Sequence, residues 1–484
     1  MKILLTGATG YIGKRLLPAL INDGHRVVCC TRDINRFNVP ASIKDKIEVI
    51  EIDLLEKDSL KRIPKDINAA YYLVHSMAAS SDYEALELTA AKNFVGAVNQ
   101  TDAEHVIYLS GIVNEESLSK HLSSRKNVED ELSKGKFQLT TLRAGIIIGS
   151  GSASFEIIRD LVEKLPIMIT PKWLNTKCQP IGITDVILML ASCLFNKETY
   201  DRNFDIGGKD ILTYKEMLLE FAVERNLKRR IYTVPVMTPK LSSYWLYFVT
   251  STSYKLAVNL VESMKIEVVC RDHEINDILG IHPIGYQEAL VKAFAKIEKN
   301  DIASSWKDSN VSSGFNPHTS DFIKVPSHGC FVDERSKQFE SRERTINKVW
   351  SIGGQTGWYY GNWLWKLRGY IDKLVGGVGL RRGRTNVSSI FVGDSLDFWR
   401  VIYANKEEGR LILYAEMKLP GEAWLEFEIV ESNLVQTATF RPLGILGRLY
   451  WYSVLPFHGF IFNGMLTKLV DNSEMNTLES QSYT

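Results

Sequence analysis

Three glycines close to the start of the chain have the spacing of a phosphate-binding turn. Gly7, Gly10 and Gly13 follow the apolar run at residues 3–5 and lead into an apolar helical pattern. The first glycine permits a tight turn, the second lets backbone approach a pyrophosphate, and the third lets the helix pack closely on the strand. The positive end of that helix would face the phosphates. The predicted dinucleotide-binding residues are Gly7, Ala8, Thr9, Gly10, Tyr11, Ile12 and Gly13.

A charged pair follows the second predicted strand, at the position where such folds distinguish NAD from NADP. Arg32 and Asp33 come directly after the apolar run at residues 26–30. A carboxylate there would bind the ribose hydroxyls of NAD, whereas a guanidinium would bind the 2′-phosphate of NADP. Arg32 favours NADP, and Asp33 keeps NAD open.

The elements that carry these residues alternate between strand and helix. Strands are expected at residues 2–5, 26–30, 47–52, 69–74, 105–109 and 139–148, and helices at 13–22, 55–61 and 82–100. The strands are continuous apolar runs, as a parallel sheet covered on both faces requires. The predicted fold class is therefore α/β, a Rossmann-type doubly wound parallel sheet.

The stretch TGATGYIG at residues 6–13 resembles the signature of extended and atypical short-chain dehydrogenases/reductases, which include the NAD-dependent epimerase/dehydratase-like proteins. The resemblance covers residues 1–299, including LRAGIIIG at 142–149, and implies an NAD(P)-binding domain with a small substrate lobe. It implies that Asp53 and Leu54 contact the adenine, although Asp53 could instead cap the helix expected at 55–61. It also implies that Val74 and His75 line the cofactor, although His75 could simply end a strand.

The catalytic residues implied by the resemblance depart from the family pattern. Such enzymes use a Ser that holds the carbonyl, a Tyr that exchanges the proton and a Lys that lowers the Tyr pKa. Ser110 occupies the Ser position, and alignment on Glu129 places His121 at the Tyr position and Arg125 at the Lys position. His121 and Arg125 share one helix face, yet the pKa of an arginine is too high for proton transfer. A one-residue slip would use Lys126 instead, on another side of the helix.

These residues leave three hypotheses for the first 299 residues. The first is an NADP-dependent oxidoreductase acting on a hydrophobic carbonyl or quinone-like compound, with His121 or water supplying the proton. The second is a non-catalytic NADPH-binding redox sensor or assembly factor. The third and weaker hypothesis is a nucleotide-sugar epimerase or dehydratase, which the missing Tyr–Lys pair disfavours.

The remainder of the chain has a different composition. Residues 300–322 are rich in Ser, Asn and Asp and predict a linker, whereas residues 323–470 contain most of the tryptophans. Strand-like runs at 397–404, 409–417, 424–429 and 434–440 precede a long apolar helix at 446–469, which resembles the α+β helix-grip fold of START-like proteins. That fold holds a greasy ligand, although a plain core is the alternative. Residues 450–462 could touch a membrane surface, and residues 471–484 predict a flexible tail.

Composition excludes several other classes of protein. The 484 residues carry a net charge of +1, so no strong field would attract nucleic acid. The six cysteines lack metal-ligand spacing and are expected to be free and buried, and no metal site is predicted. No apolar run is long enough for a transmembrane helix. The expected location is cytoplasmic.

Overall fold

The computed structural model describes residues 1–32, 34, 37, 45–75, 83–113, 120–234, 258, 264–298, 325, 330–354, 356–380 and 390–471. Its contacts divide the chain into two units, residues 1–314 and 315–484. Asp33, the linker predicted at 300–322 and all of the predicted tail beyond residue 471 lie outside the described residues, so the predicted domain boundaries stay predictions.

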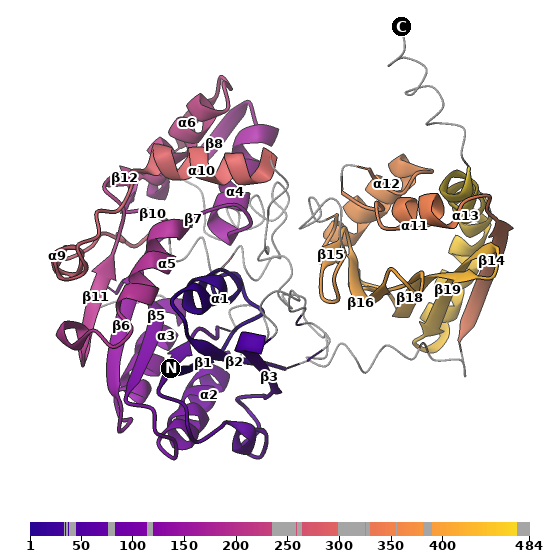
Figure 1. Cartoon of the computed structure of the whole chain (residues 1–484). Helices are drawn as coiled ribbons and strands as arrows, with labels where there is room; N and C mark the ends of the chain where they lie inside the picture. Colours follow the sequence, from indigo (N-terminus) through magenta and orange to yellow (C-terminus); the bar gives the residue numbers. More distant parts are fainter. Residues whose placement is uncertain are drawn as a thin grey trace, which may run out of the picture. The chain divides into compact units, whose positions relative to one another are not determined.

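A seven-stranded parallel sheet forms the centre of the first unit (Figure 1). The strand order is β3-β2-β1-β4-β5-β6-β11, the doubly wound order in which the chain reverses direction between β1 and β4. The prediction of a Rossmann-type sheet is thus confirmed. The strands are β1 (Lys2–Leu5), β2 (Arg26–Thr31), β3 (Ile47–Glu51), β4 (Ala69–Tyr72), β5 (His105–Gly111), β6 (Gln138–Ala144) and β11 (Arg202–Ile206).

Helices cover both faces of this sheet because its strands are apolar on both sides. Ile3 and Leu5 of β1 face one core with α1 (Gly13–Asn22), α5 (Ile183–Ser192) and α9 (Glu274–Leu279). Leu4, between them, faces a second core with α2 (Tyr83–Val98) and α3 (Lys120–Leu132). Neighbouring Cys29 and Cys30 also face opposite cores, and all six cysteines are free.

Two predicted elements of the first unit differ in the structure. The helix expected at 55–61 is a turn followed by the short 3-10 helix η3 (Ser59–Arg62), because the Asp53 carboxylate accepts a hydrogen bond from Leu55 N at 2.9 Å and the Ser59 hydroxyl binds Asp53 N at 3.0 Å. Such local bonds compete with a helix. The strand expected at 139–148 divides at Gly145, where the chain leaves the sheet and β7 (Ile147–Ile148) pairs with β10 (Ile181–Gly182).

A small lobe packs three helices around aromatic side chains, as the family resemblance implies. Phe155, Phe221 and Phe294 pack with ring centroids 5.1–5.6 Å apart. The helices are α4 (Ala153–Lys164), α6 (Tyr214–Glu224) and α10 (Tyr286–Glu298). Short strands join them: β8 (Ile167–Pro171) with β13 (Arg230–Val234), and β9 (Lys177–Cys178) with β12 (Leu212–Thr213). The 3-10 helices η4 (Lys172–Asn175) and η5 (Lys197–Thr199) complete the unit.

The second unit is a six-stranded antiparallel sheet whose apolar face is covered by helices (Figure 1). Its strands are β14 (Phe331–Gln338), β15 (Ser395–Leu396), β16 (Trp399–Asn405), β17 (Arg410–Ala415), β18 (Gly421–Val430) and β19 (Asn433–Pro442), and its helices are α11 (Arg342–Val349), α12 (Asn362–Leu374) and α13 (Gly444–Val470). The predicted meander and long final helix are confirmed. Edge strand β14 escaped prediction because its sequence, FVDERSKQ, is mostly polar.

Candidate functional site

The glycine turn after β1 requires glycine at two of its three positions. Gly7 has a φ of +68°, and a β-carbon there would lie 2.5 Å from the carbonyl oxygen of Leu73. A β-carbon on Gly13 would lie 2.3 Å from the Gly7 carbonyl oxygen, so only glycine lets α1 begin this close to the turn. The turn is closed by Gly10 N, which donates to Gly7 O at 2.8 Å. Backbone therefore lines the place that the sequence assigns to a pyrophosphate.

The start of α1 supplies the positive end of a helix at this turn. Its N-cap, Ile12, forms no side-chain capping bond, and the first N–H groups of any α-helix lack partners within the helix. The turn lies at the carboxyl end of β1, between β2 and β4, where the strand order of the sheet reverses. Open α/β sheets bind their ligands at this point. The residues present fit a dinucleotide.

Thr6 fixes the turn to the neighbouring strand, a role that the sequence did not suggest. Its hydroxyl donates to Tyr71 O at 2.8 Å and accepts from Leu73 N at 3.2 Å. The end of β1 and the segment after β4 are thereby held together, and that segment continues to Val74 and His75.

Tyr11 and Arg15 connect the turn to the loop after β7. The Arg15 guanidinium lies 3.9 Å above the Tyr11 ring and donates to Tyr11 O at 3.0 Å and to Ser150 O at 2.9 Å. Burial raises the pKa of Tyr11 to about 12, and the Arg15 charge acts in the opposite direction. Arg15, Ser150 and Thr184 also line a small pocket that α10 borders with Lys292. An i, i+4 spacing from Tyr11 could have indicated Arg15 from the sequence.

The predicted rim of the cofactor site comes from the ends of β2, β3 and β4. Arg32 is exposed directly after β2. Asp53 is half-buried and its carboxylate caps the local turn; this structural role does not exclude the adenine contact, which stays a prediction. Leu54 is buried, and its carbonyl accepts from Asn93 Nδ2 at 2.9 Å. His75 is bound through Nε2 to Leu109 O at 3.0 Å.

Ser110 lies near the end of β5 with an unsatisfied hydroxyl. Its side chain is 2% exposed and forms no hydrogen bond among the described residues. Buried hydroxyls normally have a hydrogen-bond partner, which makes this hydroxyl a candidate site residue. Across the strands, Ser110 is level with Arg143 of β6, which is level with Asp205 of β11.

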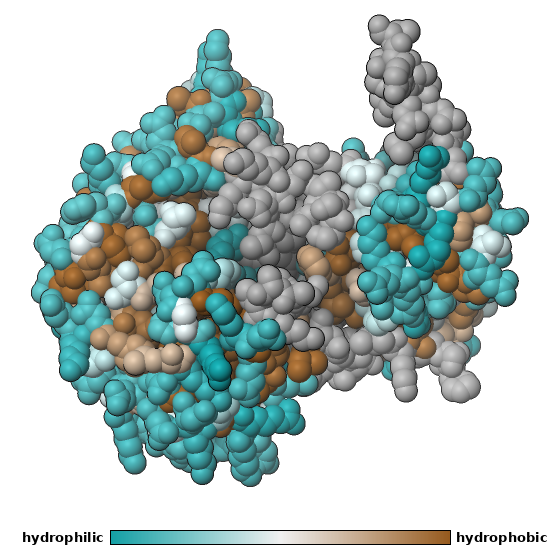
Figure 2. Space-filling view, in the orientation of Figure 1, coloured by the Kyte–Doolittle hydropathy of each residue, from teal (hydrophilic) through white to brown (hydrophobic). Residues whose placement is uncertain are grey.

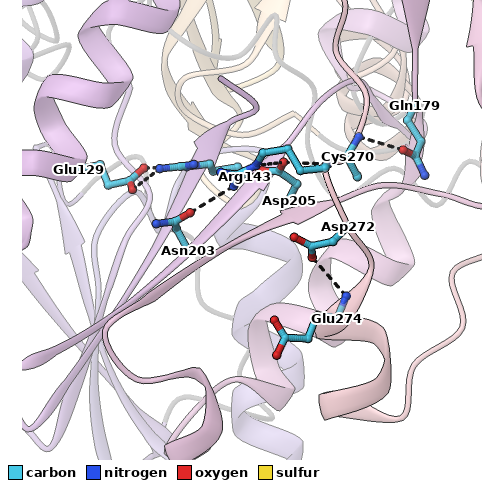
Figure 3. Close-up of polar contacts among 9 residues, drawn as sticks. Glu129, Arg143, Gln179, Asn203, Asp205, Cys270, Asp272 and Glu274 are labelled. Carbon is cyan, nitrogen blue, oxygen red and sulfur yellow. Dashed lines mark hydrogen bonds and ion pairs between the residues drawn. The ribbon is translucent and has the colours of Figure 1, made fainter. Parts of the chain in front are cut away.

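Helix α3 carries Arg125 and His121, and an ion pair holds it on the sheet. Arg143 Nε donates to Glu129 Oε2 at 3.0 Å, and a second bond joins the other carboxylate oxygen (Figure 3). One turn earlier, Arg125 has a buried Nε without a hydrogen bond among the described residues. Lys126 is exposed, which disfavours the one-residue slip. The side chain of His121 lies outside the described residues.

Residues 268–271, here called the strap, lie beside Gly145 and Gly207 at the ends of β6 and β11, and the sequence analysis did not predict them. Gln179, which is 1% exposed, holds the strap in place through two hydrogen bonds. Its Oε1 accepts from Cys270 N at 3.0 Å, and its Nε2 donates to Gly208 O at 2.7 Å. Arg271 then binds both carboxylate oxygens of Asp205, at 2.6 and 2.9 Å (Figure 3). Gln179 belongs to a motif that the sequence placed in the substrate lobe, so the lobe and the sheet are linked at this point.

Fold and site together define the first unit as a Rossmann-type unit with a glycine turn at the point where the strand order reverses. Residues 3–111 match the model of the NAD dependent epimerase/dehydratase family. Residues 327–465 match a family described as a protein of unknown function, DUF2867. Among the described residues, no group of three His, Cys, Asp or Glu side chains could hold a metal ion.

Curated relatives resemble about half of the chain. Divinyl chlorophyllide a 8-vinyl-reductase of Cucumis sativus is 23% identical over 222 residues, 43% of this chain and 52% of the relative. Photosystem II assembly factor Ycf39 of Trieres chinensis is 22% identical over 248 residues, 50% of this chain and 75% of the relative. The chain thus spans about half the length of the reductase.

Solved structures share the fold at low identity. A nucleoside-diphosphate-sugar epimerase from Staphylococcus aureus has a TM-score of 0.50 and 16% identity, covering 60% of this chain and 99% of its own. Triphenylmethane reductase of Citrobacter sp. complexed with NADP(H) has a TM-score of 0.50 and 15% identity, covering 60% of this chain and all of its own.

Proposed function

We propose that the first unit binds a nicotinamide dinucleotide, NADP in preference to NAD, and acts as an oxidoreductase on a hydrophobic carbonyl or quinone-like compound. The observation that carries the proposal is the glycine turn, where β-carbons at Gly7 and Gly13 would clash beside a helix start that has no side-chain cap. The family match over residues 3–111 supports the cofactor, and exposed Arg32 after β2 supports the 2′-phosphate.

The residues of the site would divide the chemistry between them. The bound cofactor would supply or accept a hydride. Buried Ser110 would donate a hydrogen bond to the substrate oxygen, because its hydroxyl has no other partner among the described residues. Arg125 would hold the ribose through its charged guanidinium. The proton would come from His121 or from water, since Arg125 cannot release one.

Calorimetric titration with NADPH, NADH, NADP⁺ and NAD⁺ tests the cofactor assignment. We expect NADPH to bind more tightly than NADH, and Arg32→Ala to reduce that preference about tenfold through the loss of a charge-assisted hydrogen bond. Arg26→Ala, at the opposite end of β2, is the matched control and should change nothing. Equal and weak binding of all four nucleotides would refute the assignment.

A non-catalytic role as a redox sensor or assembly factor is the second candidate. It is favoured by His121 and Arg125 in place of the Tyr and Lys of the family, and a relative named as an assembly factor aligns with half of the chain. Under this alternative the protein binds NADPH yet reduces no member of a carbonyl and quinone panel. A reductase rate that His121→Ala abolishes, with NADPH affinity unchanged, excludes it.

Epimerase or dehydratase chemistry on a nucleotide sugar is the weaker alternative. A solved neighbour carries that description, but the likeness at 16% identity extends to the fold only. Conversion of a nucleotide sugar without net consumption of cofactor would favour this reading over the reductase.

A further inference from the structure

Helix α12 of the second unit exposes a continuous apolar stripe. Its inner face is buried through Trp365 and Gly369, which belong to the side that packs on the sheet. The outer face carries large apolar side chains that are 44–65% exposed, namely Trp363, Leu367, Tyr370, Ile371 and Leu374. Their spacing of three and four residues aligns them along the full length of the helix. Scattered apolar residues are ordinary on a protein surface, but a contiguous stripe of this kind indicates an interaction site.

The charges beside the stripe are of one sign. Lys366 is exposed beside it and Lys373 is half-buried, whereas Arg368 Nη1 lies 3.7 Å from the carboxylate of Asp372, the fully buried acidic residue of α12. The Asp372 carboxylate is engaged inside the unit, accepting from Gly379 N at 2.8 Å and Lys418 N at 2.7 Å. The exposed charge on α12 is therefore positive.

The first half of α13 adds a second exposed apolar surface. The large apolar side chains at positions 445, 446, 449, 452, 457 and 460 are 53–77% exposed, and the single charged residue among positions 444–460, His458 aside, is Arg448. The segment before α12 contacts α13, where the Tyr360 and Phe460 rings lie 5.1 Å apart, and both helices cover the same side of the sheet (Figure 1). Brown apolar side chains also reach the surface of this unit in Figure 2.

We propose that α12 and the first half of α13 form a docking surface for an anionic lipid bilayer. The apolar stripe would lie among the upper acyl chains, Trp363 and Tyr370 at the level of the headgroups, and the cations on the lipid phosphates. Charge favours a lipid partner, because the exposed charged side chains of α12 and of residues 444–460, Lys366 and Arg448, are positive and complement anionic phosphates. None of the described helices is long and apolar enough to cross a bilayer, so attachment would be at the surface. The inference is independent of the proposed function.

Vesicle co-sedimentation of the full chain tests the proposal. Vesicles of phosphatidylcholine alone are compared with vesicles that also contain phosphatidylglycerol, and binding is expected only to the second kind at physiological salt. Trp363→Ser with Leu367→Ser should weaken binding at least tenfold, since the apolar area that enters the interface is lost. Lys366→Glu should weaken it by more than about fivefold, the effect expected for removing one cation near an anionic surface.

Matched controls keep the experiment decisive. Val223→Ser and Lys228→Glu alter exposed residues of the first unit, and both variants should bind vesicles as the parent does. Circular dichroism checks that each α12 variant is folded. Failure to sediment with phosphatidylglycerol vesicles, or equal binding to both kinds of vesicle, would overturn the proposal. So would a dimer that Trp363→Ser dissociates, because the stripe would then be covered by a second copy of the chain.

Discussion

At the scale of single residues, the structure supports the proposed dinucleotide-binding residues more strongly than the proposed catalytic ones. Gly7 and Gly13 are constrained by atoms less than 3 Å from where a β-carbon would lie, so their identity follows from backbone geometry. Ser110 is also constrained, as a buried hydroxyl without a partner among the described residues. Arg125 differs, because a guanidinium can hold a ribose but does not release a proton near neutral pH. The glycines and the serine expected of a dehydrogenase are thus present, whereas the Tyr–Lys pair is absent. A reduction at this site would therefore need another proton donor.

His105 makes the stability of the first unit depend on pH. Phe195 N donates to its Nδ1 at 3.1 Å, and Nε2 lies 2.9 Å from Thr140 Oγ1, whose own proton goes to Thr199 O at 2.8 Å. The neutral ring with hydrogen on Nε2 satisfies every partner, and burial lowers the pKa to about 4 from its usual 6.5.

Because the folded-state pKa is the lower one, the unfolded chain binds more protons between pH 6.5 and 4. The free energy of unfolding should therefore fall as pH falls through this range, by about 3 kcal/mol for this group. Urea denaturation of the parent and of His105→Gln at several pH values measures this effect. The difference between their free energies of unfolding should shrink as the pH is lowered. Parallel pH profiles would contradict the prediction.

Gln436 should be replaceable with a gain in stability. It lies on β19, 1% exposed, and neither atom of its amide has a hydrogen bond among the described residues. An unsatisfied buried amide costs about 1–3 kcal/mol, so Gln436→Met should raise the free energy of unfolding by about that amount. The urea-induced unfolding transition of the second unit provides the measurement. Gln338→Met, at an exposed position of β14, is the control. A loss of stability would mean that a water or ligand satisfies the amide.

At the scale of elements, the apolar pattern of the sequence predicted six strands of the central sheet, but it predicted neither β11 nor several of the accessory elements. Apolar runs such as residues 2–5 and 105–109 predict buried parallel strands because both faces of those strands must be covered. The edge strand β14 has one exposed face and a polar sequence, so its pairing with β19 follows only from long-range contacts. The same holds for the site: the glycine turn is local and was predicted, whereas the strap at 268–271 depends on Gln179, some ninety residues away.

The Glu129–Arg143 pair should control the placement of α3. Both side chains are 11–12% exposed, so Glu129→Gln leaves a largely buried guanidinium without its countercharge. Breaking such a pair costs about 3–5 kcal/mol, and the helix that carries Arg125 should loosen. Unfolding in urea measures the loss in free energy of unfolding, and titration with NADPH should show that Glu129→Gln binds the nucleotide more weakly than the parent.

Glu131→Gln on the same helix is the control for this pair. Glu131 pairs with Lys134, whose side chain is 65% exposed, so its loss should cost no more than about 1 kcal/mol. Similar losses in the two variants would show that α3 depends on its general charge rather than on the contact with β6.

At the scale of the whole molecule, two units with separate cores predict two responses to ligand. The cores around β1 and around β17 share no residue, and the chain divides between residues 314 and 315. A ligand that binds only the folded first unit stabilises that unit alone, by about 2.7 kcal/mol at a concentration one hundred times its Kd.

Scanning calorimetry of the full chain should therefore resolve two transitions, of which NADPH raises only one. Gln436→Met identifies the transition that NADPH leaves unchanged, because this substitution changes the stability of the second unit. Arg32→Ala serves as the control on the first transition, since NADPH should raise it less in this variant while the unliganded midpoint stays unchanged. Each unit would then unfold on its own, and occupancy of the dinucleotide site would leave the second unit's stability as it was. If NADPH raised both midpoints together, the units would be energetically coupled, and the independence that their separate cores predict would be wrong.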